Sequence, residues 1–496
     1  MNNSSSGWHT AMADQILTQL DERLAKAAGR APESRRRGIA RSELVQDAPV
    51  ESAPAVAKSR VPWLEIFVGV QFLWGALLFL PGSQAYRPVV RGLPYAISAA
   101  LLLVYLPKAM RGRAPGGTLL LTFAMGLLGL NFLHPTTLVS AGIAQCLFQL
   151  AIAAPMFWAW RAVSSPEQLR RLLVLAFIFN TAGSVLGVLQ VYYPDQFMPP
   201  QFSSLGTRMN ELYVESLTYV GIDGRRIIRP PGLSDQPGGA AVAGALTVVL
   251  GVGLSVGARN SSAVVAQLAA VAIGLAAIYL TQVRSLLLMS VGALGVIAVV
   301  LFRRGQARQA GRIAISAAVL VVVAFIWARS VGGESVEQRF VGITQQGAVR
   351  AYQDNRGIFV ADTFGDLLDQ YPLGAGLGRW GMMNVYFGDA GNLEAPPIHV
   401  EIQATGWLLD GGIPMWALYG GAVAMALLGT YRFCRKRVRA DLAEVAIVVL
   451  GLQALIAGFA WAGPAFNTQL GVQFWFLTSA LYGAARAVYG STAIRK

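Results

Sequence analysis

Arginine residues beside apolar stretches are the first candidates for chemistry in this chain. Arg284 lies in TQVRSLLL, where an apolar stretch begins, and Arg225, Arg226 and Arg229 occur together in GRRIIRPPGLSDQPGG. A guanidinium is a planar fork that donates two hydrogen bonds to one phosphate. We therefore expect these segments to bind a phosphorylated group. The alternative is that the arginines snorkel to the membrane surface or pair with acidic residues.

The segment APPIHVEIQATGWLLDGGIPMW contains His399, a second kind of candidate. Its imidazole can accept a proton from a hydroxyl near neutral pH, as a general base does. His134, in NFLHPTT, is expected to be structural. The chain has three histidines and shows no Walker motif, H-E-x-x-H motif or Cys/His cluster, so we predict no metal site and no cofactor. A G-x-G occurs at Gly376–Gly378, but no predicted strand precedes it, which excludes a dinucleotide site.

Further arginines occur between residues 330 and 412, at Arg339, Arg350, Arg356 and Arg379. Trp380 follows the last of them and is a candidate for stacking on a sugar ring. Other aromatic residues near the predicted membrane surface are more simply explained as an interfacial belt. They are Tyr192, Tyr193, Tyr352, Tyr386 and Trp407.

The elements that must position these residues are membrane helices. The chain has 496 residues, of which 54% are hydrophobic and 13% charged, and its mean hydropathy is +0.50. Soluble proteins contain about 25% charged residues. Apolar runs of nearly 20 residues recur, and each can cross a ~30 Å hydrocarbon core. This composition excludes a soluble enzyme, a disordered chain, a collagen-like fibre and an outer-membrane barrel. It predicts an all-α polytopic membrane protein.

We predict twelve transmembrane helices with both termini in the cytoplasm. Lys and Arg are concentrated in alternate loops, such as 303–312 and 432–439, which places those loops inside. The net charge of +14 is therefore explained by topology, not by nucleic acid as a partner. The predicted helices lie at about 62–80, 92–107, 117–133, 138–160, 170–193, 238–257, 263–281, 285–302, 313–329, 413–430, 443–461 and 471–488.

Four regions flank or connect the helices. Residues 1–61 are rich in Ser, Ala and Arg and are expected to be a flexible cytoplasmic tail, or to include an amphipathic helix at 11–28. The transmembrane domain, 62–488, includes two long outer segments at 194–237 and 330–412, and 489–496 is a short cytoplasmic end. Functional groups are often carried by loops on a rigid scaffold. The second outer segment is predicted to contain an amphipathic helix, Arg356–Tyr371, followed by a glycine-rich turn.

The order of these features resembles the O-antigen ligase and polysaccharide polymerase superfamily of bacterial inner membranes. Four segments carry the resemblance and together cover about 225–415: RPPGLSDQP, VRSLLLMSVGALG, NRGIFVADTFGDLLDQYPLGAGLGRW and IHVEIQATGWLLDGGIP. The chain departs from the family pattern at Val400, where a polar residue is usual. It also departs at Gly411 and Gly412, which lie one or two places late, and it is therefore similar to a divergent member.

The resemblance implies a metal-independent glycosyltransferase of the GT-C-like class. Its donor would be a glycan on undecaprenyl pyrophosphate, and its acceptor a hydroxyl group at the periplasmic face. Guanidinium groups would stabilise the charge of the leaving pyrophosphate. The implied roles are pyrophosphate binding for Arg229 and Arg284, with Arg226 beside them; donor binding or loop ordering for Arg356 and Arg379; glycan contact for Trp380; and acceptor activation, or a hydrogen bond to the pyrophosphate, for His399.

Three functions stay open at this point. A polymerase would join repeat units into exopolysaccharide or O-antigen, whereas a ligase would transfer the glycan to the lipid A-core of lipopolysaccharide. A transporter of glycan or lipid is the third, although the chain shows no convincing internal repeat. The two long outer segments favour a polymerase, which must hold two glycans. The expected partners are the lipid-linked glycan, membrane lipid, and flippase and chain-length regulator proteins.

Overall fold

The computed structural model describes residues 62–80, 82–109, 114–199, 217–234, 236–258, 260–389, 391–435 and 438–493. The chain divides into two units, Met1–Arg60 and Val61–Lys496, and the description below concerns the second. The predicted tail, with its helix at 11–28, lies outside the described residues. The described chain consists of helices and one two-stranded sheet.

The helices of the first half are α2 (Trp63–Leu73), η1 (Trp74–Phe79), η2 (Ser83–Tyr86), α3 (Arg87–Ala109), α4 (Thr118–Leu130), η3 (Asn131–Leu133), α5 (Val139–Ala162), α6 (Pro166–Tyr192) and α7 (Pro194–Phe197). Those of the second half are α11 (Gly239–Val256), α12 (Ser261–Thr281), α13 (Arg284–Arg303), α14 (Ala307–Gln346), α15 (Ala348–Tyr352), η4 (Gln353–Gly357), α16 (Ile358–Phe364), α17 (Asp366–Gln370), α18 (Gly381–Phe387), α19 (Gln403–Phe433), α20 (Ala440–Phe459), η5 (Ala465–Asn467) and α21 (Gln469–Ala493).

Within the described ranges, nine helices are long and apolar enough to cross a membrane: α3, α5, α6, α11, α12, α13, α14, α19 and α20. Two more predicted spans fall on shorter apolar helices, Trp63–Phe79 and Thr118–Leu133. The remaining predicted span falls on α21. The prediction of an all-α polytopic membrane protein is confirmed.

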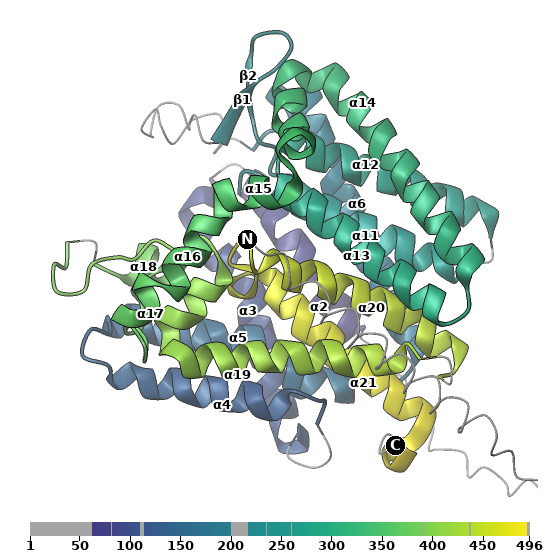
Figure 1. Ribbon diagram of the computed structural model, residues 1–496. Helices are drawn as coiled ribbons and strands as arrows, with labels where there is room; N and C mark the ends of the chain where they lie inside the picture. Colours follow the sequence, from purple (N-terminus) through teal and green to yellow (C-terminus); the bar gives the residue numbers. More distant parts are fainter. Residues whose placement is uncertain are drawn as a thin grey trace, which may run out of the picture. The chain divides into compact units, whose positions relative to one another are not determined.

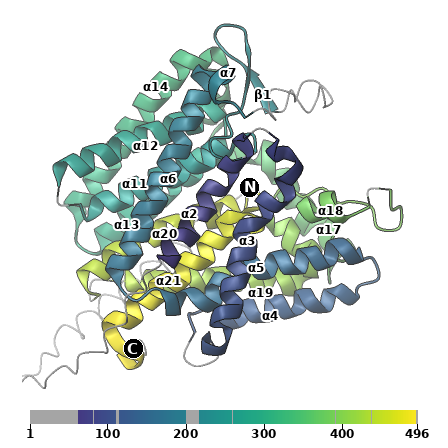
Figure 2. The same cartoon turned by 180° about the vertical axis from the view of Figure 1, so that it is seen from behind.

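The helices pack in two groups joined by α20 and α21. Figure 1 and the view from behind in Figure 2 show α6, α11, α12, α13 and α14 gathered on one side, and α4, α5 and α19 on the other. Glycines allow close approach inside the first group: a Cβ on Gly244 of α11 would lie 2.4 Å from the Gly274 carbonyl oxygen of α12. Small residues at such crossings let membrane helices pack backbone to backbone.

The second outer segment is more helical than predicted, and its predicted helix is not continuous. Helix α14 runs past its expected end, with a break at Gly333, where φ is 60°. The single helix predicted over 356–371 is wrong. The chain there forms a π-helical turn and two short helices separated at Gly365, whose backbone is not helical. Glycine favours such breaks because it has the greatest backbone freedom and a low helix propensity.

Helix α19 begins ten residues before the predicted span and is interrupted at Gly411 and Gly412. The preceding loop fills the interruption: Ile413 N donates to the Pro372 carbonyl at 3.0 Å, and Ala375 N donates to the Leu409 carbonyl at 2.8 Å. A Cβ on Gly412, where φ is 65°, would collide with the Pro372 carbonyl. The two glycines therefore interrupt the helix, and the loop backbone supplies hydrogen-bond partners at the interruption.

The first outer segment contains a β-hairpin that the sequence did not predict. Strand β1 (Thr218–Val220) pairs with β2 (Arg226–Ile228) in antiparallel register, with Tyr219 opposite Ile227. The hairpin packs on the kinked end of α14, because a Cβ on Gly333 would lie 3.1 Å from the Ile222 side chain. It leads directly into the segment that contains Arg229.

Candidate functional site

Two of the predicted site residues meet at one carboxylate. The Arg356 guanidinium forms an ion pair with Glu401 Oε2, and His399 Nε2 lies 2.8 Å from Glu401 Oε1. Arg356 comes from the π-helical turn η4, a geometry that is frequent at functional sites. His399 and Glu401 are two residues apart in an extended segment, which places both side chains on one side of the chain.

The carboxylate determines how the imidazole is presented. Burial alone would raise the pKa of the Glu401 carboxyl, but the charge of Arg356 and the hydrogen bonds from His399 and Arg356 hold the pKa below its usual range. An ionised carboxylate only accepts hydrogen bonds, so a neutral His399 donates through Nε2. Nδ1 then keeps its lone pair. The His399 side chain is 73% exposed, so that atom is accessible to a second molecule.

Aromatic contacts and a backbone contact support this cluster. Phe359 lies beside both side chains, with its ring centroid 6.0 Å from the Arg356 guanidinium carbon and 6.3 Å from the His399 ring centroid. Tyr352, one turn before Arg356, donates its hydroxyl to the Trp461 carbonyl at 2.9 Å. The cluster is therefore held by helix η4, the segment before α19 and the loop after α20.

The glycine-rich turn is anchored by a buried aspartate that the sequence analysis did not single out. Asp410 Oδ1 accepts from Trp380 Nε1 at 2.6 Å and from Gln145 Nε2 at 2.5 Å. The other end of the Gln145 amide accepts from Gly378 N at 2.6 Å. Trp380 is 3% exposed, so its ring has no open face for a sugar. This placement favours a structural role for Trp380.

Arg379 also points into the protein. It is 4% exposed, and its guanidinium donates to the carbonyls of Pro396 at 2.9 Å and Ala375 at 3.0 Å. Of the two roles expected for Arg379, these contacts favour loop ordering, because they tie the glycine-rich turn to the segment that leads to His399. His134 belongs to the same support: its Nδ1 contacts Thr136 Oγ1, whose hydroxyl donates to Ala375.

The arginines predicted to bind pyrophosphate lie on two adjacent segments. Gly238 N donates to the Arg229 carbonyl at 3.3 Å. A Cβ on Gly238 would lie within 4 Å of Thr281 and Val283, the residues that precede Arg284. The loop between Arg229 and α11 therefore packs against the turn that presents Arg284. Helices α11 and α13 both begin here, and helix N-termini favour anions.

Arg229 and Arg284 are both partly buried. Arg229 Nε is buried without a hydrogen-bond partner among the described residues, and burial lowers the pKa of this guanidinium, an effect that nearby Tyr219 partly opposes. Arg284 is the first residue of α13 and lies two residues after Gln282, which has φ of 59°. Such a left-handed backbone is uncommon for a non-glycine residue and is often found at functional sites. Arg226 is exposed on β2, opposite Val220.

Both groups of residues lie at the same end of the bundle. Met289, just over one turn after Arg284, contacts the Cβ position of Gly458, near the end of α20. The Ala460 carbonyl accepts a hydrogen bond from Gln403 N at 2.9 Å. Gln403 is the first residue of α19 and lies four residues after His399. The start of α13, the end of α20 and the start of α19 thus lie at one end of the bundle.

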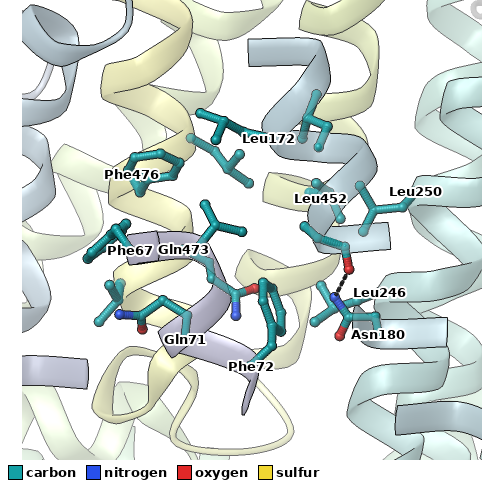
Figure 3. A pocket seen from close by; sticks show the side chains of 15 residues that line it. Phe67, Gln71, Phe72, Leu172, Asn180, Leu246, Leu250, Leu452, Gln473 and Phe476 are labelled. Atoms are coloured by element: carbon teal, nitrogen blue, oxygen red, sulfur yellow. Dashed lines mark hydrogen bonds between the residues drawn. The ribbon is translucent and has the colours of Figure 1, made fainter. Parts of the chain in front are cut away.

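A separate apolar cavity lies inside the bundle, between α2, α6, α11, α20 and α21. Figure 3 shows Phe67, Phe72, Leu172, Leu246, Leu250, Leu452 and Phe476 around it, with three amide side chains, Gln71, Asn180 and Gln473. The side-chain amide of Asn180 donates a hydrogen bond to the Ala176 carbonyl at 2.8 Å. None of the predicted site residues lines this cavity, so it takes no part in the candidate site.

Comparison with protein-family models gives no match, and comparison with curated protein sequences gives none either. The site is therefore argued from its own residues. Sequence reasoning missed Glu401 and Asp410. Glu401 had a usable signal, because His-Val-Glu in an extended segment places His399 and Glu401 on one face. Asp410 stands in an otherwise apolar helix, where an ionisable residue is a functional or structural hypothesis by default.

Proposed function

We propose that this protein is a membrane glycosyltransferase that polymerises lipid-linked oligosaccharide repeat units into exopolysaccharide or O-antigen. The observation that carries the proposal is the Arg356–Glu401–His399 cluster, an accessible imidazole oriented by an ionised carboxylate. It lies at the same end of the bundle as Arg229 and Arg284, which suit an anionic leaving group. The donor would be a glycan on undecaprenyl pyrophosphate.

The proposed topology has twelve spans, with both termini in the cytoplasm and the candidate site at the periplasmic face of the bacterial inner membrane. Each predicted span coincides with a described helix, counting the three that are short or less apolar. Alternate helices end near the basic loops 303–312 and 432–439, as the rule for cytoplasmic loops requires. The candidate site lies at the opposite ends of these helices.

The proposed reaction is an in-line displacement at the anomeric carbon of the donor sugar. The acceptor oxygen forms a bond to this carbon as the bond to the pyrophosphate oxygen breaks, and the electron pair leaves with the pyrophosphate. The hydroxyl proton passes to Nδ1 of His399 while Glu401 stabilises the imidazolium that forms. Arg229, Arg284 and the starts of α11 and α13 stabilise the leaving charge.

Arg356 would hold Glu401 in place, and Arg379 and Trp380 would order the glycine-rich turn beneath the acceptor. A second role for His399 is a hydrogen bond to the pyrophosphate. The two roles separate by experiment: a general base affects turnover, whereas a phosphate contact also affects donor affinity. If His399 contacts the pyrophosphate, His399→Gln should keep part of the turnover and part of the donor affinity that His399→Ala loses.

The test uses purified full-length protein in lipid nanodiscs, supplied with lipid-linked repeat units alone. The expected products are longer lipid-linked chains and free undecaprenyl pyrophosphate, and His399→Ala should lower turnover by ~10²–10⁴. Arg229→Gln should weaken donor binding. Its matched control is Arg225→Gln, an exposed arginine of the same hairpin that pairs with Asp223. Equal loss in both arginine variants would contradict a pyrophosphate role for Arg229.

The same assay separates the alternatives. A product that forms only after lipid A-core is added means a ligase, with the same displacement and a different acceptor. Movement of glycan across a sealed bilayer without any new glycosidic bond means a transporter. The two long outer segments, with their separate helices α15 to α18 and hairpin β1–β2, favour the polymerase because they offer space for two glycans.

A further inference from the structure

At the C-terminal end of α5, two arginines contact the ring of one tryptophan. The guanidinium carbon of Arg161 lies 4.2 Å from the Trp160 ring centroid, and that of Arg486, from α21, lies 5.2 Å from it. Trp160 is buried and donates its indole nitrogen to the Phe157 carbonyl at 3.0 Å. Both cations are within the distance at which a ring face attracts them. The ring therefore holds two like charges close together.

Two donors of Arg161 have no acceptor among the described residues. They are Nε and Nη2, and both atoms are buried. A buried donor without an acceptor is costly, and more so when it is charged. Two acidic residues at this end pair with other arginines: Glu65 with Arg171 at 2.6 Å and Glu444 with Arg170 at 3.9 Å. In the part of the chain that the structure describes, neither Arg161 nor Arg486 forms an ion pair with a carboxylate.

The position of the pair indicates what that acceptor is. Helix α5 starts beside the candidate site, where Leu138 N donates to the Leu377 carbonyl at 3.0 Å. Arg161 is 22 residues further on than Val139. At 1.5 Å per residue this is ~33 Å, about the thickness of the hydrocarbon core. Arg161 and Arg486 thus lie at the opposite membrane surface, at the depth of lipid phosphates.

We propose that Arg161, Arg486 and Trp160 bind the phosphate of an anionic phospholipid in the leaflet opposite the candidate site. A phosphodiester offers the oxygens that Arg161 lacks, and arginine binds phosphate through its fork. A lipid with a net negative headgroup is favoured over a zwitterionic lipid, because two guanidinium charges must be balanced. Tryptophan at this depth is typical of the membrane interface.

The experiment measures lipid binding to purified full-length protein in detergent by native mass spectrometry. The probes are phosphatidylglycerol, phosphatidylcholine and inorganic phosphate. We expect phosphatidylglycerol to bind at least ten-fold more tightly than phosphatidylcholine, and this preference to be lost in the double variant Arg161→Gln/Arg486→Gln. The control Arg432→Gln removes an exposed arginine near the same end of the bundle and should keep the preference.

Three results would overturn the proposal: an unchanged preference in the double variant, equal loss in the Arg432 control, or inorganic phosphate binding as tightly as the lipid. The last result would indicate a site for free phosphate. Arg486→Gln alone leaves Arg161 and its ring contact in place and should reduce the preference partially. If the double variant is not monodisperse, the single variant Arg486→Gln is used in its place. None of these measurements depends on the glycosyltransferase activity.

Discussion

Replacement of Glu401 by glutamine tests how the cluster works. The change keeps the size of the side chain but removes the charge that binds Arg356 and accepts from His399 Nε2 at 2.8 Å. The amide can also turn its NH₂ group toward the imidazole, which favours the opposite tautomer and takes the lone pair from Nδ1. We therefore expect Glu401→Gln to lower turnover without preventing the donor from binding.

The size of the effect follows from exposure. Loss of the orienting carboxylate in a buried catalytic triad costs ~10⁴ in rate. Here Glu401 is 30% exposed and His399 far more, so water can partly replace the lost contact. We expect a loss of ~10²-fold in turnover, near the lower limit for a general base. The loss of folding free energy should be small, about 1 kcal/mol, because the Arg356 pair is also partly exposed.

The pH dependence of stability provides a second measurement. The folded-state pKa of Glu401 lies below its usual range, so its contribution is present above the unfolded pKa, roughly 4.3, and is lost as the pH falls through the folded value. Between pH 7 and pH 3 the wild type should therefore lose more stability than Glu401→Gln.

The assay is turnover of lipid-linked repeat units at saturating donor, with donor affinity measured separately and thermal unfolding at several pH values. Near-normal turnover in Glu401→Gln would refute the orienting role of the carboxylate. An equal loss in turnover and donor affinity would favour a phosphate contact by His399 instead.

Three further predictions concern the rest of the molecule. Arg284→Ala should abolish polymer formation while the protein still accumulates, and Arg284→Lys should restore little activity, because an ammonium cannot replace the two-pronged guanidinium; a fully active lysine variant would mean that charge alone suffices. Asp410→Ala should lower the thermal unfolding temperature in detergent, because it leaves two buried donors without an acceptor at a cost of about 1–3 kcal/mol each; an unchanged temperature would contradict the anchoring role. Cysteine labelling in cells should reach 335–395 from the periplasm and 303–312 only after permeabilisation, and the reverse pattern would invert the proposed topology.

The helices were predictable from the sequence because a membrane span needs nearly 20 apolar residues in a row. Every predicted span coincides with a helix, although the bounds differ where a helix continues beyond its apolar run. Helix α14 is the clearest case: the apolar run ends near residue 329, but the helix continues to Gln346. Hydropathy identifies the apolar run but not polar residues that continue the helix, so it could not show this extension.

The candidate site was partly predictable. Arg229 and Arg284 stood out because arginines beside apolar stretches need a local reason, Arg356 because it lies in the long segment 330–412, and His399 because an imidazole can act as a general base. Their partners did not stand out, since an ion pair such as Arg356–Glu401 joins residues 45 positions apart. Trp380 was expected to contact the glycan, and Arg379 to bind the donor or order the loop. They are buried because the turn folds back into the interruption of α19, a tertiary contact without a local signal.

The interruption of α19 also bears on how the chain enters the membrane. Residues 413–433 alone form a helix of ~31 Å, enough to cross the hydrocarbon core. The half before the break includes Asp410, whose carboxyl group is expensive in lipid unless protein surrounds it. The groups that surround it, from Gln145 and Trp380, are made earlier by the ribosome. Residues 413–433 can therefore span the hydrocarbon core alone, whereas the shorter half needs Gln145 and Trp380 around Asp410 before it can lie in an apolar environment.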